Sequence, residues 1–308
     1  DMALWDIKGR EANMPVYQLI GGKCREGVAL YAYANGESRE EILDEAQKRL
    51  EEGYHNIRLQ YFPMKGFSQN QRPWRPVGAK EGFYQDPKAY VEETVAMFDE
   101  ARSRFGYAPE LVHDVHERVP AGDAIVLAKA LEPYRLFFLE DLFAPDQYEY
   151  YKNVKAVCTT PVSHGELCTN QLERKTLISE RLIDFIRIHP SMIGGFTPAI
   201  KIAHFSEIFG VRTAWHAPTD MNPVGHTAQM HMDLACTNFG IQGWSGFGEN
   251  VREVFPGIPE VKNGYAYVNS APGFGVEFDE EKAKKYPAKD EIIQWTQFRY
   301  TDGSLATP

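Results

Sequence analysis

The chain alternates short apolar runs with longer amphipathic stretches, and this alternation repeats at a nearly regular interval. From residue 110 onward, successive candidate strands begin 26, 25, 23, 28 and 27 residues apart. Such an interval fits one strand, one helix and two short loops. Strands are predicted at residues 28–33, 56–60, 110–114, 136–140, 161–165, 184–188, 212–216 and 239–243. Helices are predicted at 39–52, 87–105, 120–132, 171–180, 197–209 and 224–236. Eight strands favour a closed α/β barrel over an open doubly wound sheet.

Three segments follow from this pattern. Residues 28–250 are predicted to form the barrel, residues 1–27 a helix with its linker, and residues 251–308 a C-terminal extension. The first helix is predicted to end at Gly9. Residues 61–86 show no strand or helix pattern and are rich in aromatic residues and arginine. Because loops of that length in compact domains are commonly functional, this one is predicted to be a lid.

Charge and composition exclude several classes of function. The 33 basic and 43 acidic residues give a net charge of −10, which disfavours a broad grip on nucleic acid. The sequence contains no run of about 18 apolar residues, so no membrane-spanning helix is predicted. The motifs GxGxxG and GxxxxGK[ST] are absent, as are closely spaced cysteine pairs. These features predict a cytoplasmic α/β protein without a dinucleotide-binding fold or a zinc ribbon.

Three carboxylates stand at the predicted C-terminal ends of neighbouring strands. They are Asp114, Glu140 and Glu166, and they are spaced 26 residues apart. The catalytic residues of barrels of this kind lie at those strand ends. Three converging acids repel one another unless a hard cation is present, and oxygen ligands suit Mg²⁺. The pattern therefore predicts a magnesium site; the alternative is that the acids are solvated groups or helix caps.

Several histidines lie near the same strand ends. His116 follows Asp114 by two residues and is predicted to lie on the same side, as an acid or base. His216 is a second acid or base candidate after the seventh strand, and His189 is a candidate for the barrel mouth. His113 is predicted to point into the helix layer. Trp244 could pack against a substrate, although core packing is the commoner role of tryptophan.

Several longer motifs carry a resemblance to a known family. They are HDVHERV, FLEDLFAPD, SHGELCTN, IRIHPSMIGG, AWHAPTDMNPVGH and PGFGVEFDEEKAKKYP. Together they resemble the mannonate dehydratase branch of the enolase superfamily, which includes starvation-sensing proteins. The resemblance covers essentially the whole chain. It implies a TIM-like (β/α)₇β barrel, a homo-oligomer, and an N-terminal capping domain that this sequence lacks.

The resemblance also implies an activity and a set of residues. Mg²⁺ would bind Asp114, Glu140 and Glu166, and the substrate would be a small anionic sugar acid such as D-mannonate or D-gluconate. Removal of the proton α to the carboxylate would be followed by loss of the β-hydroxyl as water. His116 maps onto the acid of the family. A tyrosine and an arginine of the long loop would act as the base, which points to Tyr84 and Arg75.

Two departures from related patterns bear on the activity. The second strand reads Arg58-Leu59-Gln60 and lacks the KxK pair of the racemase branch, which disfavours racemase chemistry. Gly243 stands where family members commonly have a glutamate at the end of the last strand. His216 is carried over as a substrate contact or as an acid or base. His189 and Trp244 are candidate substrate contacts from their positions in the sequence. The leading hypothesis is a Mg²⁺-dependent aldonate dehydratase, and the alternative is a non-catalytic or weakly active metabolite-binding homologue.

Overall fold

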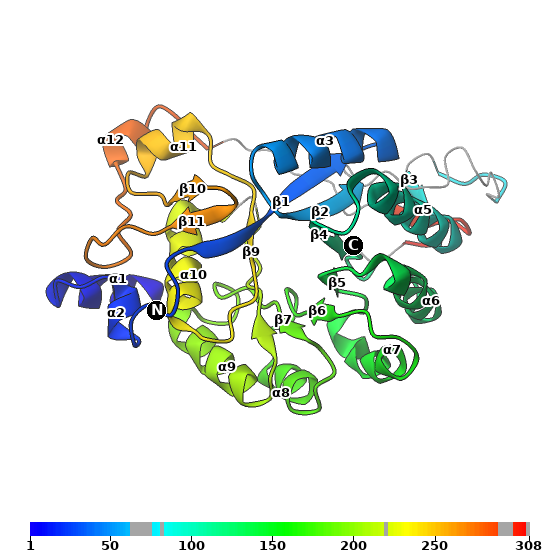
Figure 1. Cartoon of the computed structure of the whole chain (residues 1–308), viewed down its shortest axis with the longest axis horizontal. Helices are drawn as coiled ribbons and strands as arrows, with labels where there is room; N and C mark the ends of the chain where they lie inside the picture. The colour runs from blue at the N-terminus through cyan, green and yellow to red at the C-terminus, as the bar shows by residue number, and fades with distance from the viewer. Residues whose placement is uncertain (62–75, 81–82, 219–220, 289–297, 306–308) are drawn as a thin grey trace. The chain divides into compact units, whose positions relative to one another are not determined.

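Strands and helices alternate along most of the chain, as the sequence predicts (Figure 1). The computed structural model describes residues 1–61, 76–80, 83–218, 221–288 and 298–305. Internal contacts divide the chain into two compact units. Unit 1 comprises residues 1–32 and 165–291, and unit 2 comprises residues 33–164 and 292–308. The domain boundaries expected after residues 27 and 250 remain a prediction.

Unit 2 carries four parallel strands connected by helices. Its elements are α3 (Arg39–Glu51), β2 (Asn56–Tyr61), β3 (Phe83–Gln85), α5 (Pro87–Phe105), β4 (Glu110–Asp114), α6 (Ala121–Leu131), η1 (Glu132–Tyr134), β5 (Phe138–Glu140), η2 (Pro145–Tyr150), α7 (Tyr151–Val157), β6 (Val162–His164) and β12 (Phe298–Tyr300). The strands are ordered β2-β4-β5-β6. Helices α5, α6 and α7 pack one against the next beside them (Figure 1).

Local sequence signals set the ends of the helices in unit 2. The Ser38 hydroxyl accepts a hydrogen bond from the Glu41 amide and caps α3. The Asp86 carboxylate accepts hydrogen bonds from the amides of Lys88 and Ala89, and Pro87 begins α5. Both arrangements satisfy amides that a helix leaves unpaired at its first turn. The predicted starts at residues 39 and 87 are therefore confirmed.

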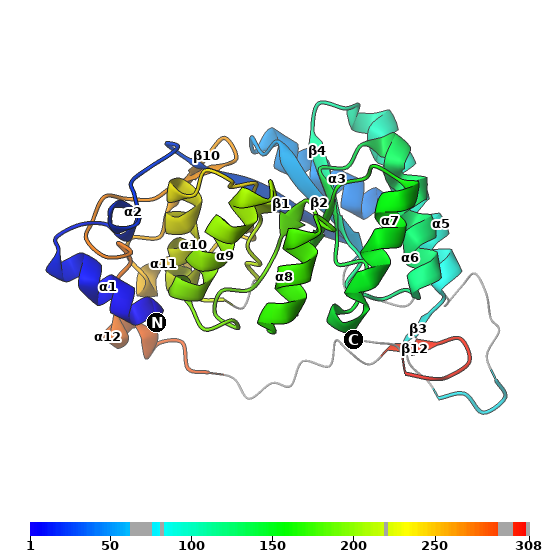
Figure 2. The same ribbon diagram turned by 90° about the horizontal axis from the view of Figure 1, so that it is seen from below.

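Unit 1 holds the N-terminal segment and the second half of the parallel strands. Its elements are α1 (Met2–Glu11), α2 (Val16–Leu19), α8 (Gln171–Ser179), β7 (Phe185–Ile186), α9 (Phe196–Ile208), β8 (Arg212–Thr213), α10 (Pro223–Ala235), β9 (Gln242–Trp244), α11 (Glu249–Val254), β10 (Glu260–Lys262), β11 (Tyr265–Tyr267) and α12 (Glu280–Ala283), together with the start of β1 (Val28–Gly36). Helices α8, α9 and α10 stand side by side (Figure 2).

Backbone pairing in unit 1 joins strands far apart in sequence. β7 pairs with β8 in parallel, and Thr213 forms an isolated bridge with Phe239 just before β9. β9 pairs in parallel with β1, where Tyr31 lies opposite Gly243. A hairpin of β10 and β11 then adds antiparallel to β1. The eight predicted strands are all present, although several are shorter than their apolar runs suggest.

The N-terminal helix corrects one prediction. Gly9 does not end α1, which continues to Glu11. A Cβ atom at Gly9 would lie 2.7 Å from the Cα atom of Gly273, so the glycine permits close packing of helix against loop. The Met14 carbonyl accepts the Gly273 amide, and the Val16 amide donates to the Gly273 carbonyl. These bonds tie the start of the chain to its C-terminal extension within unit 1.

Among the described residues, no helix combines the length and hydropathy needed to cross a lipid bilayer. The longest helix of this part of the chain, α5, contains seven charged side chains in 19 residues and packs on α6.

Asp233 on α10 gives a stability prediction. Its carboxyl is fully buried, and burial raises its pKa well above the usual range, against the opposing effect of Arg25. The folded chain then holds a proton that the unfolded chain has released, so wild-type stability falls as pH rises above the unfolded value of about 4. Asp233→Asn should therefore raise the free energy of unfolding at pH 7–8, with the gain shrinking toward pH 4.

Urea unfolding of both proteins at pH 4, 6 and 8 measures this difference. Asp99→Asn, at an exposed position of α5, is the matched control and should show no comparable trend. A destabilisation by Asp233→Asn that grows with pH would show that the carboxyl is ionised in the fold.

Candidate active site

The strand ends of unit 2 bring two acidic side chains into register. Asp114 is the last residue of β4 and Glu140 the last residue of β5, and the two are direct partners across the parallel pair. Both side chains are fully buried. Ligand oxygens of Asp114, Glu140 and Asp141 lie within 4.8 Å of one another. Buried carboxylates this close are strongly destabilised as anions unless a cation compensates them, so the donor set fits a hard divalent ion.

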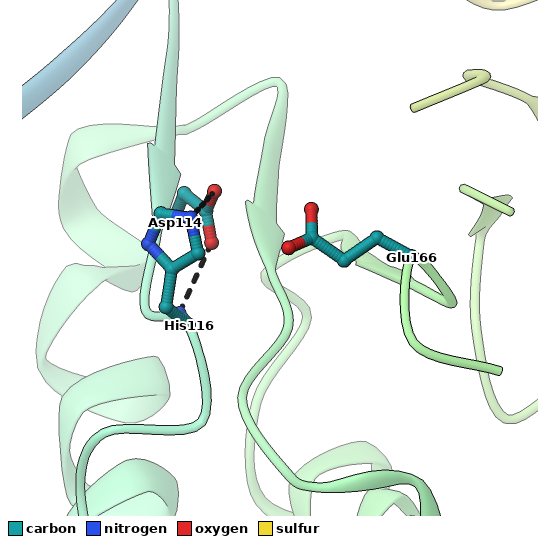
Figure 3. A group of neighbouring side chains, drawn as sticks. All are labelled: Asp114, His116 and Glu166. Atoms are coloured by element: carbon teal, nitrogen blue, oxygen red, sulfur yellow. Dashed lines mark hydrogen bonds and ion pairs between the residues drawn. The ribbon is translucent and has the colours of Figure 1, made fainter. Parts of the chain in front are cut away.

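Asp114 is contacted by two cationic or potentially cationic groups. Arg58 on β2 donates from Nη1 to Oδ2 at 2.6 Å. His116 contacts the same oxygen through Nε2 at 2.9 Å, and its amide donates to Oδ1 at 3.0 Å (Figure 3). The Arg58 guanidinium also stacks over the Tyr33 ring, with its carbon 4.4 Å from the centroid. These contacts fix the orientation of the Asp114 carboxylate.

The backbone around this acidic group is strained. His116, Glu117 and Asp141 are non-glycine residues with φ values of 53°, 52° and 42°. Left-handed conformations cost roughly 1–3 kcal/mol each and concentrate at functional sites. The predicted proximity of His116 to Asp114 is confirmed, but its cause differs from the expected one. β4 ends at Asp114, and the left-handed turn, rather than strand alternation, returns His116 to the carboxylate.

His113 has the structural role that its place in the strand predicts. Its Nδ1 lies 2.8 Å from the Leu59 carbonyl, and its Nε2 lies 2.8 Å from the Tyr90 hydroxyl of α5. Nδ1 therefore carries the proton, and Nε2 accepts from the tyrosine. Burial lowers the pKa of His113 to about 4, so the ring is neutral near pH 7. Its ring packs against those of Tyr90 and Phe98 on α5.

In unit 1, the His216 ring lies beside the carboxylate of Glu166 and the guanidinium of Arg187. Its Nδ1 lies 2.7 Å from Oε2 of Glu166, which stands on the loop after β6. Arg187, fully buried, places Nη2 3.3 Å from the same nitrogen and donates to the Trp215 carbonyl at 3.2 Å. Nδ1 of His216 therefore faces both a carboxylate oxygen and an N–H group of a guanidinium.

His189 and Trp244 also lie in unit 1. The His189 ring centroid is 5.3 Å from that of His216, so these two predicted residues are neighbours. Trp244 ends β9 and is buried. Its ring meets His226 and Phe247 edge to face, at 5.9 and 5.2 Å. This packing is the commoner role of tryptophan, and its contact with a substrate stays a prediction.

Comparison with protein family models shows which family the chain belongs to. Residues 41–282 match the family model described as enolase C-terminal domain-like. Residues 1–21 match the N-terminal domain of the mandelate racemase / muconate lactonizing enzyme family. A D-galactonate dehydratase family member from Enterocloster bolteae is 49% identical over all of this chain and 77% of its own length. The chain belongs to the D-galactonate dehydratase family of the enolase superfamily.

Solved structures agree with this membership. An enolase from Pantoea ananatis with bound D-gluconate and Mg is 47% identical, with a TM-score of 0.95 over all of this chain and 78% of that one. A protein named D-galactonate dehydratase family member RspA, also from Pantoea ananatis, is 47% identical over the whole chain. A mandelate racemase/muconate lactonizing enzyme from Jannaschia, 23% identical with a TM-score of 0.79, shares the fold. The chain is thus a superfamily member with the TIM-barrel-like α/β fold, in a family of hydro-lyases.

The two residues of this chain that were predicted to act as the general base, Arg75 and Tyr84, belong to the long loop of residues 61–86. Arg75 lies outside the described residues. Tyr84 lies on β3, is fully buried, and donates its hydroxyl hydrogen bond to the Lys80 carbonyl. The role of this pair as general base stays a prediction.

Three polar residues of this family member were not singled out from sequence. Arg58 and Arg187 are charged residues inside otherwise apolar strand runs, and Asp141 directly follows Glu140. A charge within a buried strand is uncommon unless it is paired. The arginines of NIRLQ and DFIRI could therefore have been predicted to have buried, charged or polar partners. Asp141 had no comparable signal, because an acid after a strand is usually a helix cap or a solvated group.

Proposed function

We propose that the chain is a Mg²⁺-dependent dehydratase of aldonates, with D-gluconate or D-mannonate as substrate. The observation that carries this proposal is the aligned, fully buried pair Asp114 and Glu140, whose ligand oxygens lie within 4.8 Å together with those of Asp141. The Pantoea ananatis structure with D-gluconate and Mg supports the ligand class. The D-galactonate dehydratase names of the relatives support the reaction class.

The metal would be held by Asp114, Glu140 and Glu166. Glu166 is two residues beyond His164, the last residue of β6, so the chain itself carries it to the end of the strand next to β5. A bound divalent cation would stabilise the negative charge that develops on the carboxylate of the substrate when its α-proton leaves. The buried position of Asp114 and Glu140 strengthens that interaction because it excludes water.

The side chains divide the proton transfers between them. A base removes the proton from C2, and we assign this step to Tyr84 with Arg75, as the family resemblance implies. His116, oriented by Asp114, gives a proton to the hydroxyl that leaves C3 as water. The resulting enol takes up a proton at C3 and becomes a 2-keto-3-deoxy acid. His216 and His189 would contact substrate hydroxyls through ring nitrogens, and Trp244 would border them.

Incubation with a panel of aldonates, including D-gluconate, D-mannonate and D-galactonate, tests the proposal. A chromogenic assay for 2-keto-3-deoxy acids should detect product with at least one of them in the presence of Mg²⁺, and none after chelation by EDTA. Binding of an aldonate and Mg²⁺ without turnover would overturn the proposed dehydratase activity. It would support the alternative of a metabolite-binding protein, which Gly243 suggests. The cytoplasmic location and the homo-oligomer remain predictions.

A further inference from the structure

We propose that Asp141 and His164 form a buried positioning pair that sets the affinity of the cation site. The proposal rests on the proposed function, because it concerns the same acidic group. Both residues lie in unit 2, at the ends of neighbouring strands β5 and β6. Neither stands among the expected ligands or catalytic groups.

The contact between the two side chains is short and fully enclosed. His164 Nδ1 lies 2.6 Å from Asp141 Oδ1, and both side chains have zero exposure. The Tyr151 ring packs against the His164 ring with centroids 5.1 Å apart, which restricts its rotation. A contact this short inside a close-packed interior restricts the rotation of the Asp141 carboxylate.

The Asp141 backbone connects the pair to both sides of the acidic group. Its amide donates to the Ser163 carbonyl at 3.0 Å, and its carbonyl accepts the Glu117 amide at 2.8 Å. The Val115 amide donates in the same way to the Glu140 carbonyl. The turn that carries His116 is thereby fastened to residues 140 and 141. The left-handed φ of 42° at Asp141 is the strain that this arrangement requires.

A third buried carboxylate beside Asp114 and Glu140 is unfavourable for the fold alone. An oxygen of Asp141 lies within 4.8 Å of ligand oxygens of both residues, so its negative charge repels theirs. The same charge attracts a divalent cation placed among them. Because His164 occupies Oδ1, the carboxylate cannot rotate away from the group. We infer that the pair adds attraction for the cation, and that Asp141 acts as a supporting group rather than as a principal ligand.

Asp141→Asn tests the charge with little change of shape. Asparagine tolerates a left-handed φ, and its carbonyl oxygen can still accept from His164. Calorimetric titration of the metal-free protein with MgCl₂ should show an affinity about 10–100-fold weaker than that of the wild type, the range typical for groups that support metal ligands. The melting temperature of the metal-free protein should be unchanged or higher, because a buried charge has been removed.

Two substitutions at His164 separate positioning from packing. His164→Asn keeps an amide nitrogen near the place of Nδ1 and should retain most of the affinity, whereas His164→Leu should lose about tenfold or more. Equal affinities in these two variants, or an Asp141→Asn protein that binds Mg²⁺ within twofold of the wild type, would overturn the role of the pair. If the wild type itself binds no Mg²⁺, the proposed function fails together with this inference.

Discussion

Replacing Glu140 with glutamine should abolish both tight Mg²⁺ binding and aldonate turnover. Glu140 is fully buried at the end of β5 and lies opposite Asp114 in the parallel pair. Glutamine keeps the shape but removes the charge that a hard cation requires. Loss of the metal forfeits several kcal/mol of transition-state stabilisation, so kcat/KM should fall by about 10³-fold or more. Steady-state kinetics and calorimetric titration with MgCl₂ measure the two effects.

Glu110→Gln is the matched control for this variant. Glu110 is exposed at the opposite end of the neighbouring strand β4, so neither Mg²⁺ affinity nor rate should change. The metal-free Glu140→Gln protein should be at least as stable as the wild type, because one buried repulsive charge is gone. Full activity in Glu140→Gln would remove the acidic group of unit 2 from the mechanism.

Replacing His116 with glutamine should reduce kcat while leaving the metal site in place. General acid catalysis by a positioned side chain contributes about 10²–10⁴-fold, so a loss in that range is expected. Mg²⁺ affinity should stay within a few fold, because Asp114 keeps its contact with Arg58. The measurement is kcat at saturating Mg²⁺, together with the calorimetric affinity of the variant for the metal.

The exposed His204 of α9 provides the control for histidine replacement, and His204→Gln should behave as the wild type. If His116→Gln loses Mg²⁺ binding and rate together, the histidine acts through the metal site instead of as an acid. If it loses neither, His116 is excluded from the reaction.

The positions of Asp114 and Glu140 could be predicted because the ends of the strands can be recognised in the sequence. Asp114 and Glu140 each close an apolar run, and the spacing of the runs predicted adjacent parallel strands. Register then follows from the topology, since the carboxyl ends of parallel strands meet at one edge. The contact of His116 was also predicted, but the left-handed backbone that makes it is set by the Glu117 and Asp141 hydrogen bond, which depends on tertiary structure.

Other features depended on contacts that no local pattern reports. The Gly9 pattern suggested a helix end, whereas the close approach of Gly273, over 260 residues away, explains the glycine. The partner of Arg58 lies on β4 and that of Arg187 lies after β8, so the roles of both arginines appeared only in the fold. One local signal was overlooked: Asn263-Gly264, with φ values of 50° and 72°, forms the turn between β10 and β11 that such a dipeptide favours.

The reaction in deuterated water tests the central claim most directly. With Mg²⁺ and an aldonate that the enzyme turns over, early product returned to ordinary water should have the mass of the substrate less one water plus one mass unit, and NMR should place the single deuterium at C3. That result requires removal of the C2 proton, loss of the C3 hydroxyl and protonation of the enol from solvent. An aldonate recovered unchanged from every Mg²⁺-loaded reaction, or a product without deuterium at C3, would contradict the account.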